Sequence, residues 1–122
     1  MPDKRILIVD DEPNVVRTLE FVLKKEGYDV VSAVNGEEAI AKARESKPNL
    51  MFLDVMMPKK DGYEVCRELK SDLNLRDIHI VMLSAKGQEA DREKALNVGA
   101  NEFITKPFSP MGVVGRVKEL LA

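Results

Sequence analysis

Reactive side chains stand at the ends of several short apolar segments of the chain. The residues concerned are Asp10, Asp11, Asp54, Ser84 and Lys106. Three of them are carboxylates, which repel one another and raise one another's pKa unless a cation lies among them. Mg²⁺ takes one or two carboxylates and completes its shell with water and phosphate oxygen. The set therefore predicts a magnesium site that is completed by a phosphorylated group.

The elements that must position these side chains alternate between strand and helix. Nearly continuous apolar runs and clusters of β-branched residues predict strands at Ile6–Val9, Tyr28–Val34, Leu50–Leu53, Ile78–Leu83 and Glu102–Thr105. Apolar spacing, capping residues and glycine or proline stops predict helices at 13–26, 35–46, 63–71, 88–98 and from Ser109-Pro110 onward. Strict alternation predicts an α/β fold, a doubly wound sheet of five parallel strands with five helices.

The strand order decides which reactive side chains can meet. Ligands of such sheets bind beyond the carboxyl ends of the strands. In the flavodoxin-like strand order 2-1-3-4-5, Asp54 at the end of the third strand lies between Asp10 and Asp11, which follow the first strand, and Ser84, which follows the fourth. Strand five is roughly 9 to 10 Å from strand three, so only a long side chain such as Lys106 could approach Asp54. A carboxylate can attack phosphorus to form an aspartyl phosphate, and Asp54 is best placed for this. Ser84 and Lys106 could balance the phosphate oxygens, with Thr105 as a rival hydroxyl.

The composition limits the class of protein. A chain of 122 residues with 44% hydrophobic and 33% charged residues predicts one globular domain over residues 1–122. A formal charge of −2, with no tryptophan and no long basic run, argues against direct nucleic-acid binding by this domain. The single cysteine, Cys66, excludes an internal disulfide. The apolar run at Ile6–Val9 is too short for a signal peptide or a membrane span, so a cytoplasmic location is expected.

Four ordered motifs resemble the receiver domain of two-component response regulators. They are LIVDDE at Leu7–Glu12, LDVMMPKKDG at Leu53–Gly62, MLSA at Met82–Ala85 and FITKPF at Phe103–Phe108. The resemblance covers the whole chain, and the pattern is closest to receivers that precede a winged DNA-binding domain. It implies a phosphoprotein of a phosphorelay, a signalling switch that assists its own phosphorylation and dephosphorylation and is not an enzyme with a separate substrate.

The resemblance also implies roles for the acidic residues. Asp54 would accept a phosphoryl group from a sensor histidine kinase or a phosphotransfer protein. Asp11 and Asp54 would bind Mg²⁺, with the Met56 carbonyl as a further ligand and Asp10 acting mainly through water. The neighbouring segment Asn101-Glu102 departs from the pattern, because this subgroup tends to carry two aspartates there on its dimer face.

Ser84, Lys106 and Phe103 would transmit the phosphorylation signal to the protein surface. The resemblance implies that Ser84 and Lys106 contact the phosphoryl oxygens, that Phe103 is the switch aromatic, and that the Lys106-Pro107 peptide bond is cis. Ser84 moving toward the phosphoryl group would vacate space for Phe103 and change the face made by the fourth helix, fifth strand and fifth helix. That face would engage an effector domain or output protein, with the domain a monomer or a phosphorylation-dependent homodimer.

Plainer interpretations exist for single residues. Phe103 is as well explained by the core as by a switch, and the side chains of Met56 and Met57 are expected to serve packing. His79 has no visible partner in the sequence and is expected to be structural or exposed. Cys66 is expected to be a small buried hydrophobe. Two glycines of the last helix, at positions 112 and 115, each cost about 1 kcal/mol relative to alanine, so either a loosened helix or the close approach of a partner is expected there.

Three other functions compete with the signalling switch. A docking module with a vestigial site would share the fold but act without phosphorylation. A phosphatase of the haloacid-dehalogenase type also uses an aspartyl nucleophile, but its motif needs a second acid two residues later, where this chain has Met56. A nucleotide or flavin binder would need glycines after strand one, where the loop is acidic.

Overall fold

A computed structural model describes residues 4–57, 60–85 and 89–122. Strands and helices alternate along this part of the chain, in the order β1 (Arg5–Val9), α1 (Pro13–Lys25), β2 (Asp29–Ala33), α2 (Gly36–Ser46), β3 (Leu50–Asp54), α3 (Gly62–Ser71), β4 (His79–Ser84), α4 (Glu89–Asn97), β5 (Glu102–Thr105) and α5 (Pro110–Leu120). The sheet has five parallel strands in the order β2-β1-β3-β4-β5. The predicted fold class and strand order are confirmed.

The strand boundaries differ from the predicted ones by at most one residue at either end. β3 includes Asp54, which pairs with Leu83, and β4 includes Ser84, which pairs with Thr105. These two reactive residues are therefore the last residues of strands and not the first of loops. The predicted start of the fourth helix, at Gln88, lies outside the described residues, as do residues 58 and 59 of the LDVMMPKKDG motif.

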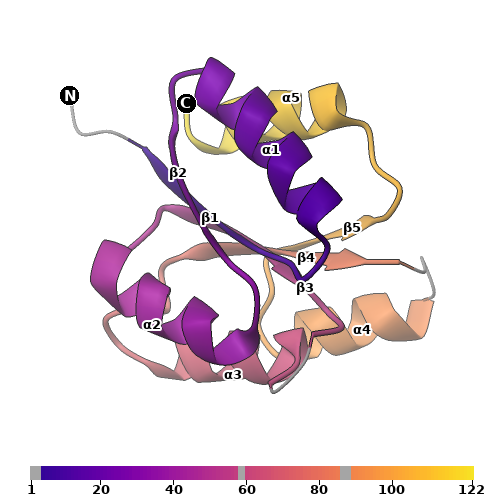
Figure 1. The fold of residues 1–122 in the computed structure, drawn as a ribbon. Helices are drawn as coiled ribbons and strands as arrows, with labels where there is room; N and C mark the ends of the chain where they lie inside the picture. Colours follow the sequence, from indigo (N-terminus) through magenta and orange to yellow (C-terminus); the bar gives the residue numbers. More distant parts are fainter. Residues whose placement is uncertain (1–3, 58–59, 86–88) are drawn as a thin grey trace.

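Helices cover both faces of the sheet (Figure 1). α1 and α5 lie on one face, and α2, α3 and α4 lie on the other. Alternate residues of β1 supply the two cores, because successive side chains of a strand point to opposite faces. Ile6 and Ile8 pack with α1 and α5, whereas Leu7 and Val9 pack with the other layer. Burial on both faces explains why the strands are continuously apolar.

Local signals fix several helix ends. The Asn35 side chain accepts a hydrogen bond from the Glu38 backbone N–H at 2.9 Å, so the predicted cap is confirmed; Glu38 Oε1 accepts a hydrogen bond at 3.1 Å from the N–H of Val34, one residue before the cap, instead of from Asn35 as in a full capping box. Gly27 and Gly99 end α1 and the turn after α4 with positive φ angles of 94° and 101°, which glycine adopts most readily. Among the described residues, no helix is long and apolar enough to cross a membrane.

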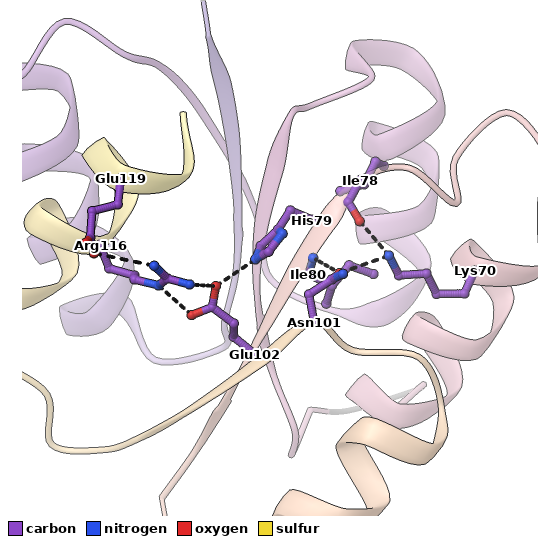
Figure 2. A network of polar contacts seen from close by, with 8 residues as sticks. All are labelled: Lys70, Ile78, His79, Ile80, Asn101, Glu102, Arg116 and Glu119. Carbon is purple, nitrogen blue, oxygen red and sulfur yellow. Dashed lines mark hydrogen bonds and ion pairs between the residues drawn. The ribbon is translucent and has the colours of Figure 1, made fainter. Parts of the chain in front are cut away.

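A polar network links β4, β5 and α5 (Figure 2). The guanidinium of Arg116 donates two hydrogen bonds to the Glu102 carboxylate, at 2.8 and 2.7 Å, and Nε2 of His79 lies 2.8 Å from the same carboxylate. His79 begins β4 away from the site and has the structural role that was expected, although its partner Glu102 was not visible in the sequence. Asn101 accepts hydrogen bonds from the Ile80 N–H and from Lys70 Nζ. The segment Asn101-Glu102 is thus bound within its own chain.

Of the predictions for Cys66, Met57 and Met56, the first two are confirmed and the third is wrong. Cys66 is fully buried, and burial raises the pKa of its thiol to about 11, as fits a structural cysteine. Met57 packs against the core, as expected. The Met56 side chain is 75% exposed, so the prediction that it serves packing is wrong. Its place in the loop after β3 turns the side chain to solvent beside the site.

Candidate functional site

The predicted reactive residues gather at the carboxyl edge of the sheet. Asp10 follows β1, Asp54 ends β3, Ser84 ends β4 and Lys106 follows β5. Asp10, Asp54 and Ser84 are 0%, 4% and 4% exposed, and no other polar side chain of the described residues is buried to this degree. Burying an ionisable group is costly unless it is paired or neutralised. Buried polar side chains at neighbouring strand ends therefore identify this edge of the sheet as the candidate functional site.

Lys106 is the cation of this site. Its Nζ lies 2.9 Å from Asp10 Oδ2, 2.8 Å from Glu12 Oε1 and 3.5 Å from Asp54 Oδ1. The expectation that a long side chain from strand five approaches Asp54 is therefore met in the geometry. Glu12 was not among the predicted site residues. It belongs to the acidic run after β1, but its contact with Lys106 was not predicted. One lysine faces three carboxylates, so the site carries excess negative charge.

The charge imbalance appears in the pKa values. Burial and the charge of Asp10 raise the pKa of Asp54 to about 7, against the lowering effect of Lys106 and of a backbone hydrogen bond from Met56. Burial works against the charge of Lys106, yet contacts with Asp10 and Glu12 and the charge of Asp54 together raise the pKa of Lys106 above its ordinary value. The lysine therefore stays charged while Asp54 titrates near neutral pH.

The donor set fits a hard divalent cation. Carboxylate oxygens of Asp10, Glu12 and Asp54 lie within 4.8 Å of one another. Asp10 Oδ1 accepts a hydrogen bond from the Glu12 N–H at 2.9 Å, whereas its buried Oδ2 has the ion pair with Lys106 but accepts no hydrogen bond within the described part of the chain. Mg²⁺ binds oxygen ligands, usually one or two carboxylates together with water, and this cluster can supply them. Asp11 is exposed, and its charge also contributes to the raised pKa of Asp54.

The backbone behind Asp54 is closely packed. A Cβ added at Gly62 would lie 2.2 Å from the backbone oxygen of Asp54, so only glycine fits there. The N–H of Val55 donates to the Leu83 carbonyl at 2.9 Å, which fixes the end of β3 against β4. Lys106 is anchored to the same strand by its backbone, since its N–H donates to the Ser84 carbonyl. The Lys106-Pro107 peptide bond is cis, as the resemblance implied.

Ser84 and Phe103 connect the site with α4. The Ser84 hydroxyl donates a hydrogen bond to Asp91 Oδ2 at 3.2 Å, and Asp91 Oδ1 lies 3.5 Å from the Tyr63 hydroxyl. Phe103 is 8% exposed and belongs to the core on the α2–α3–α4 side, with the Arg92 guanidinium 5.2 Å from its ring centre. Asp91 was not predicted from the sequence, because nothing in its neighbourhood marks it beyond the charge common to this helix.

Comparisons with known proteins agree with this geometry. Residues 6–118 match the family described as response regulator receiver domain. The alkaline phosphatase synthesis transcriptional regulatory protein PhoP of Bacillus subtilis is 48% identical over 119 residues, which are 98% of this chain and 49% of that protein. The transcriptional regulatory protein ResD of the same organism is 46% identical over 98% of this chain and 48% of its own length. The chain thus spans about half the length of these curated relatives.

Solved structures share the fold over the whole domain. A two-component response regulator from Clostridium difficile superposes with a TM-score of 0.91 at 28% identity, covering 98% of this chain and 96% of that one. The beryllofluoride-activated N-terminal receiver domain of RstA from Klebsiella pneumoniae gives a TM-score of 0.88 at 30% identity, covering 97% and 98%.

Proposed function

Because the chain belongs to the response regulator receiver family, we propose that Asp54 is the phosphoacceptor of its phosphorylation-dependent signalling switch. The observation that carries the proposal is a buried carboxylate at the end of β3 that lies beside Lys106 and an acidic cluster. One carboxylate oxygen of Asp54 would attack the phosphorus of a phosphohistidine on a sensor histidine kinase or phosphotransfer protein. The P–N bond breaks as the new P–O bond forms, and the electron pair leaves with the imidazole, which takes up a proton.

The remaining residues of the site would prepare this transfer. Asp10, Glu12 and Asp54 would hold Mg²⁺, with Asp11 and the Met56 carbonyl as further candidate ligands. When bound, the ion supplies the positive charge that the cluster lacks. The chain itself contributes a positive charge beside Asp54, because the ammonium group of the lysine after β5 lies 3.5 Å from that carboxylate.

A receiver domain is not an enzyme in the usual sense, since the group that reacts is its own side chain. We propose that Lys106 and Ser84 nevertheless assist phosphorylation and dephosphorylation by binding the phosphoryl oxygens. Phe103 would report the change to the face made by α4, β5 and α5. The relatives are named as transcriptional regulators, so an effector that acts on transcription is the proposed output, with this domain as monomer or phosphorylation-dependent homodimer.

Intact mass spectrometry after incubation with acetyl phosphate and Mg²⁺ tests the proposal. We expect one phosphoryl adduct on the native protein, none on Asp54→Asn, and an undiminished adduct on Asp77→Asn, which removes an exposed carboxylate far from the cluster. Omitting Mg²⁺ should suppress the adduct. No adduct on the folded native protein, or an equal adduct on Asp54→Asn, would contradict the assignment and would favour a docking module that acts without phosphorylation.

A further inference from the structure

The hydroxyl of Ser84 is held by α4 in this structure. Its proton is directed to Asp91 Oδ2, 3.2 Å away. We propose that Asp91 is a positioning residue: it holds the Ser84 hydroxyl in the unphosphorylated state, and this hydrogen bond must break when Ser84 binds a phosphoryl group on Asp54. The inference rests on the proposed function of Asp54 and Ser84, and adds a residue from another helix that sets how readily the site accepts its phosphoryl group.

The two hydrogen bonds of Ser84 exclude each other. A serine hydroxyl has one proton to donate. If that proton goes to Asp91 it cannot also go to a phosphoryl oxygen, which brings no proton of its own at neutral pH. Phosphorylation therefore has to give up the contact with Asp91, and the free energy of that contact opposes phosphorylation.

Asp91 has a second polar contact, on α3. Its second oxygen lies 3.5 Å from the Tyr63 hydroxyl on α3, and Lys94 Nζ lies 4.6 Å from the centre of the Tyr63 ring. Asp91, Tyr63 and Ser84 line one cavity of about 380 Å³ at the carboxyl edge of the sheet. The long contact with α3 and the shared cavity place the Asp91 carboxylate beside Ser84, with one oxygen toward each partner.

The position of Asp91 also explains why the contact matters for α4. Among the described side chains of α4, Ala95 is the one that is fully buried, and Asp91 is half-buried. A helix with so little apolar anchoring depends on its polar contacts with the sheet. Breaking the Ser84–Asp91 hydrogen bond would therefore loosen the N-terminal half of α4 at the same moment that the phosphoryl group is bound.

The size of the effect follows from the geometry. A hydrogen bond to a charged acceptor contributes more than a neutral one, but 3.2 Å is long for such a bond and the carboxylate is partly solvated. We expect removal of the acceptor to raise the affinity for a phosphoryl analogue about three- to tenfold. The loss of one negative charge would act in the same direction, so the test must separate charge from hydrogen bonding.

The test is the affinity for beryllofluoride in the presence of Mg²⁺, measured by amide NMR titration. The variants are Asp91→Ala, Asp91→Asn and the exposed control Glu93→Ala, each in the native and the Ser84→Ala background. We expect Asp91→Ala to bind three- to tenfold more tightly, Asp91→Asn to lie between it and the native protein because its amide oxygen still accepts a hydrogen bond, and Glu93→Ala to match the native protein. In the Ser84→Ala background, Asp91→Ala should gain clearly less than in the native background, because only the effect of charge remains.

Other outcomes would overturn the inference in distinguishable ways. Equal gains from Asp91→Ala in both backgrounds would assign the effect to charge and remove Ser84 from the argument. Unchanged or weaker binding by Asp91→Ala, with normal binding by the native protein, would refute the inference and leave the proposed function intact. Failure of the native protein to bind beryllofluoride would refute both. Should Asp91→Ala not fold, Asp91→Asn must still bind more tightly than the native protein, and its gain must be smaller in the Ser84→Ala background.

Discussion

Replacing Asp54 with asparagine should stabilise the metal-free protein, and the gain should grow with pH. Burial and the charge of Asp10 raise the pKa of Asp54 from its ordinary 3.8 to about 7. Between these values the folded chain binds a proton at Asp54 that the unfolded chain has released, so the free energy of unfolding falls as the pH rises from 3.8 to about 7. Above that range the folded protein carries the full cost of an ionised Asp54, which asparagine avoids.

The magnitude can be worked from the same values. A difference between 3.8 and about 7 is equivalent to about 4 kcal/mol at 1.36 kcal/mol per pKa unit. This is an upper limit, since Lys106 and water rearrange around an ionised carboxylate, and we expect about 2 kcal/mol at pH 8. For a chain of 122 residues, 2 kcal/mol corresponds to an increase in Tm of about 8 °C.

Thermal and urea unfolding followed by circular dichroism in EDTA, from pH 4 to pH 8.5, would measure the gain. Asp54→Asn should match the native protein near pH 4 and exceed it increasingly above pH 5, whereas the control Asp77→Asn should show no such trend. Mg²⁺ should then stabilise the native protein more than Asp54→Asn, because it binds the folded acidic cluster. A variant at pH 8 that is no more stable than the native protein, or a gain that does not change with pH, would refute the reasoning.

Three further predictions concern the scaffold. Gly62→Ala should cost about 3 kcal/mol or more, because its Cβ would lie 2.2 Å from the Asp54 oxygen, whereas Gly115→Ala, with nothing within 4 Å, should stabilise the protein by up to about 1 kcal/mol; equal urea midpoints for the two variants would contradict this. Asn35→Ala should lower the free energy of unfolding by about 1 kcal/mol, seen as a lower urea midpoint at unchanged m, since the N-cap is lost. Amide hydrogen exchange should show α5 less protected than α1, and equal protection would count against a loosened α5.

The features that could be predicted from the sequence are those set by local pattern and topology. Continuous apolar runs identify strands that are buried on both faces, and the alternation with helices leaves few possible topologies. In a parallel sheet all strands end at one edge, so Asp54, Ser84 and Lys106 had to meet there once the strand order was known. The reach of Lys106 follows from the spacing of neighbouring strands and the length of its side chain.

The contacts that escaped prediction join side chains from different elements. The pairing of His79 with Glu102 depends on the register between β4 and β5, in which Val81 pairs with Glu102, and a shift by one residue would have turned Glu102 to the other face. Asp91 contacts Ser84 from α4, a helix whose pattern of apolar residues is too weak to show which side faces the sheet. The contact of Glu12 with Lys106 needs the loop after β1 to turn back over the site.

The reach of Lys106 across the sheet has a consequence for protein synthesis. The ribosome adds this lysine 94 residues after Glu12, which at usual translation rates takes about 5 to 20 s. Until then the nascent chain holds the acidic half of the site without its cation, and the repulsion between Asp10 and Asp54 disfavours closure of that edge. β5 also pairs only with β4, at the border of the sheet. We therefore expect the phosphoryl site to form only after β5 and Lys106 have left the exit tunnel.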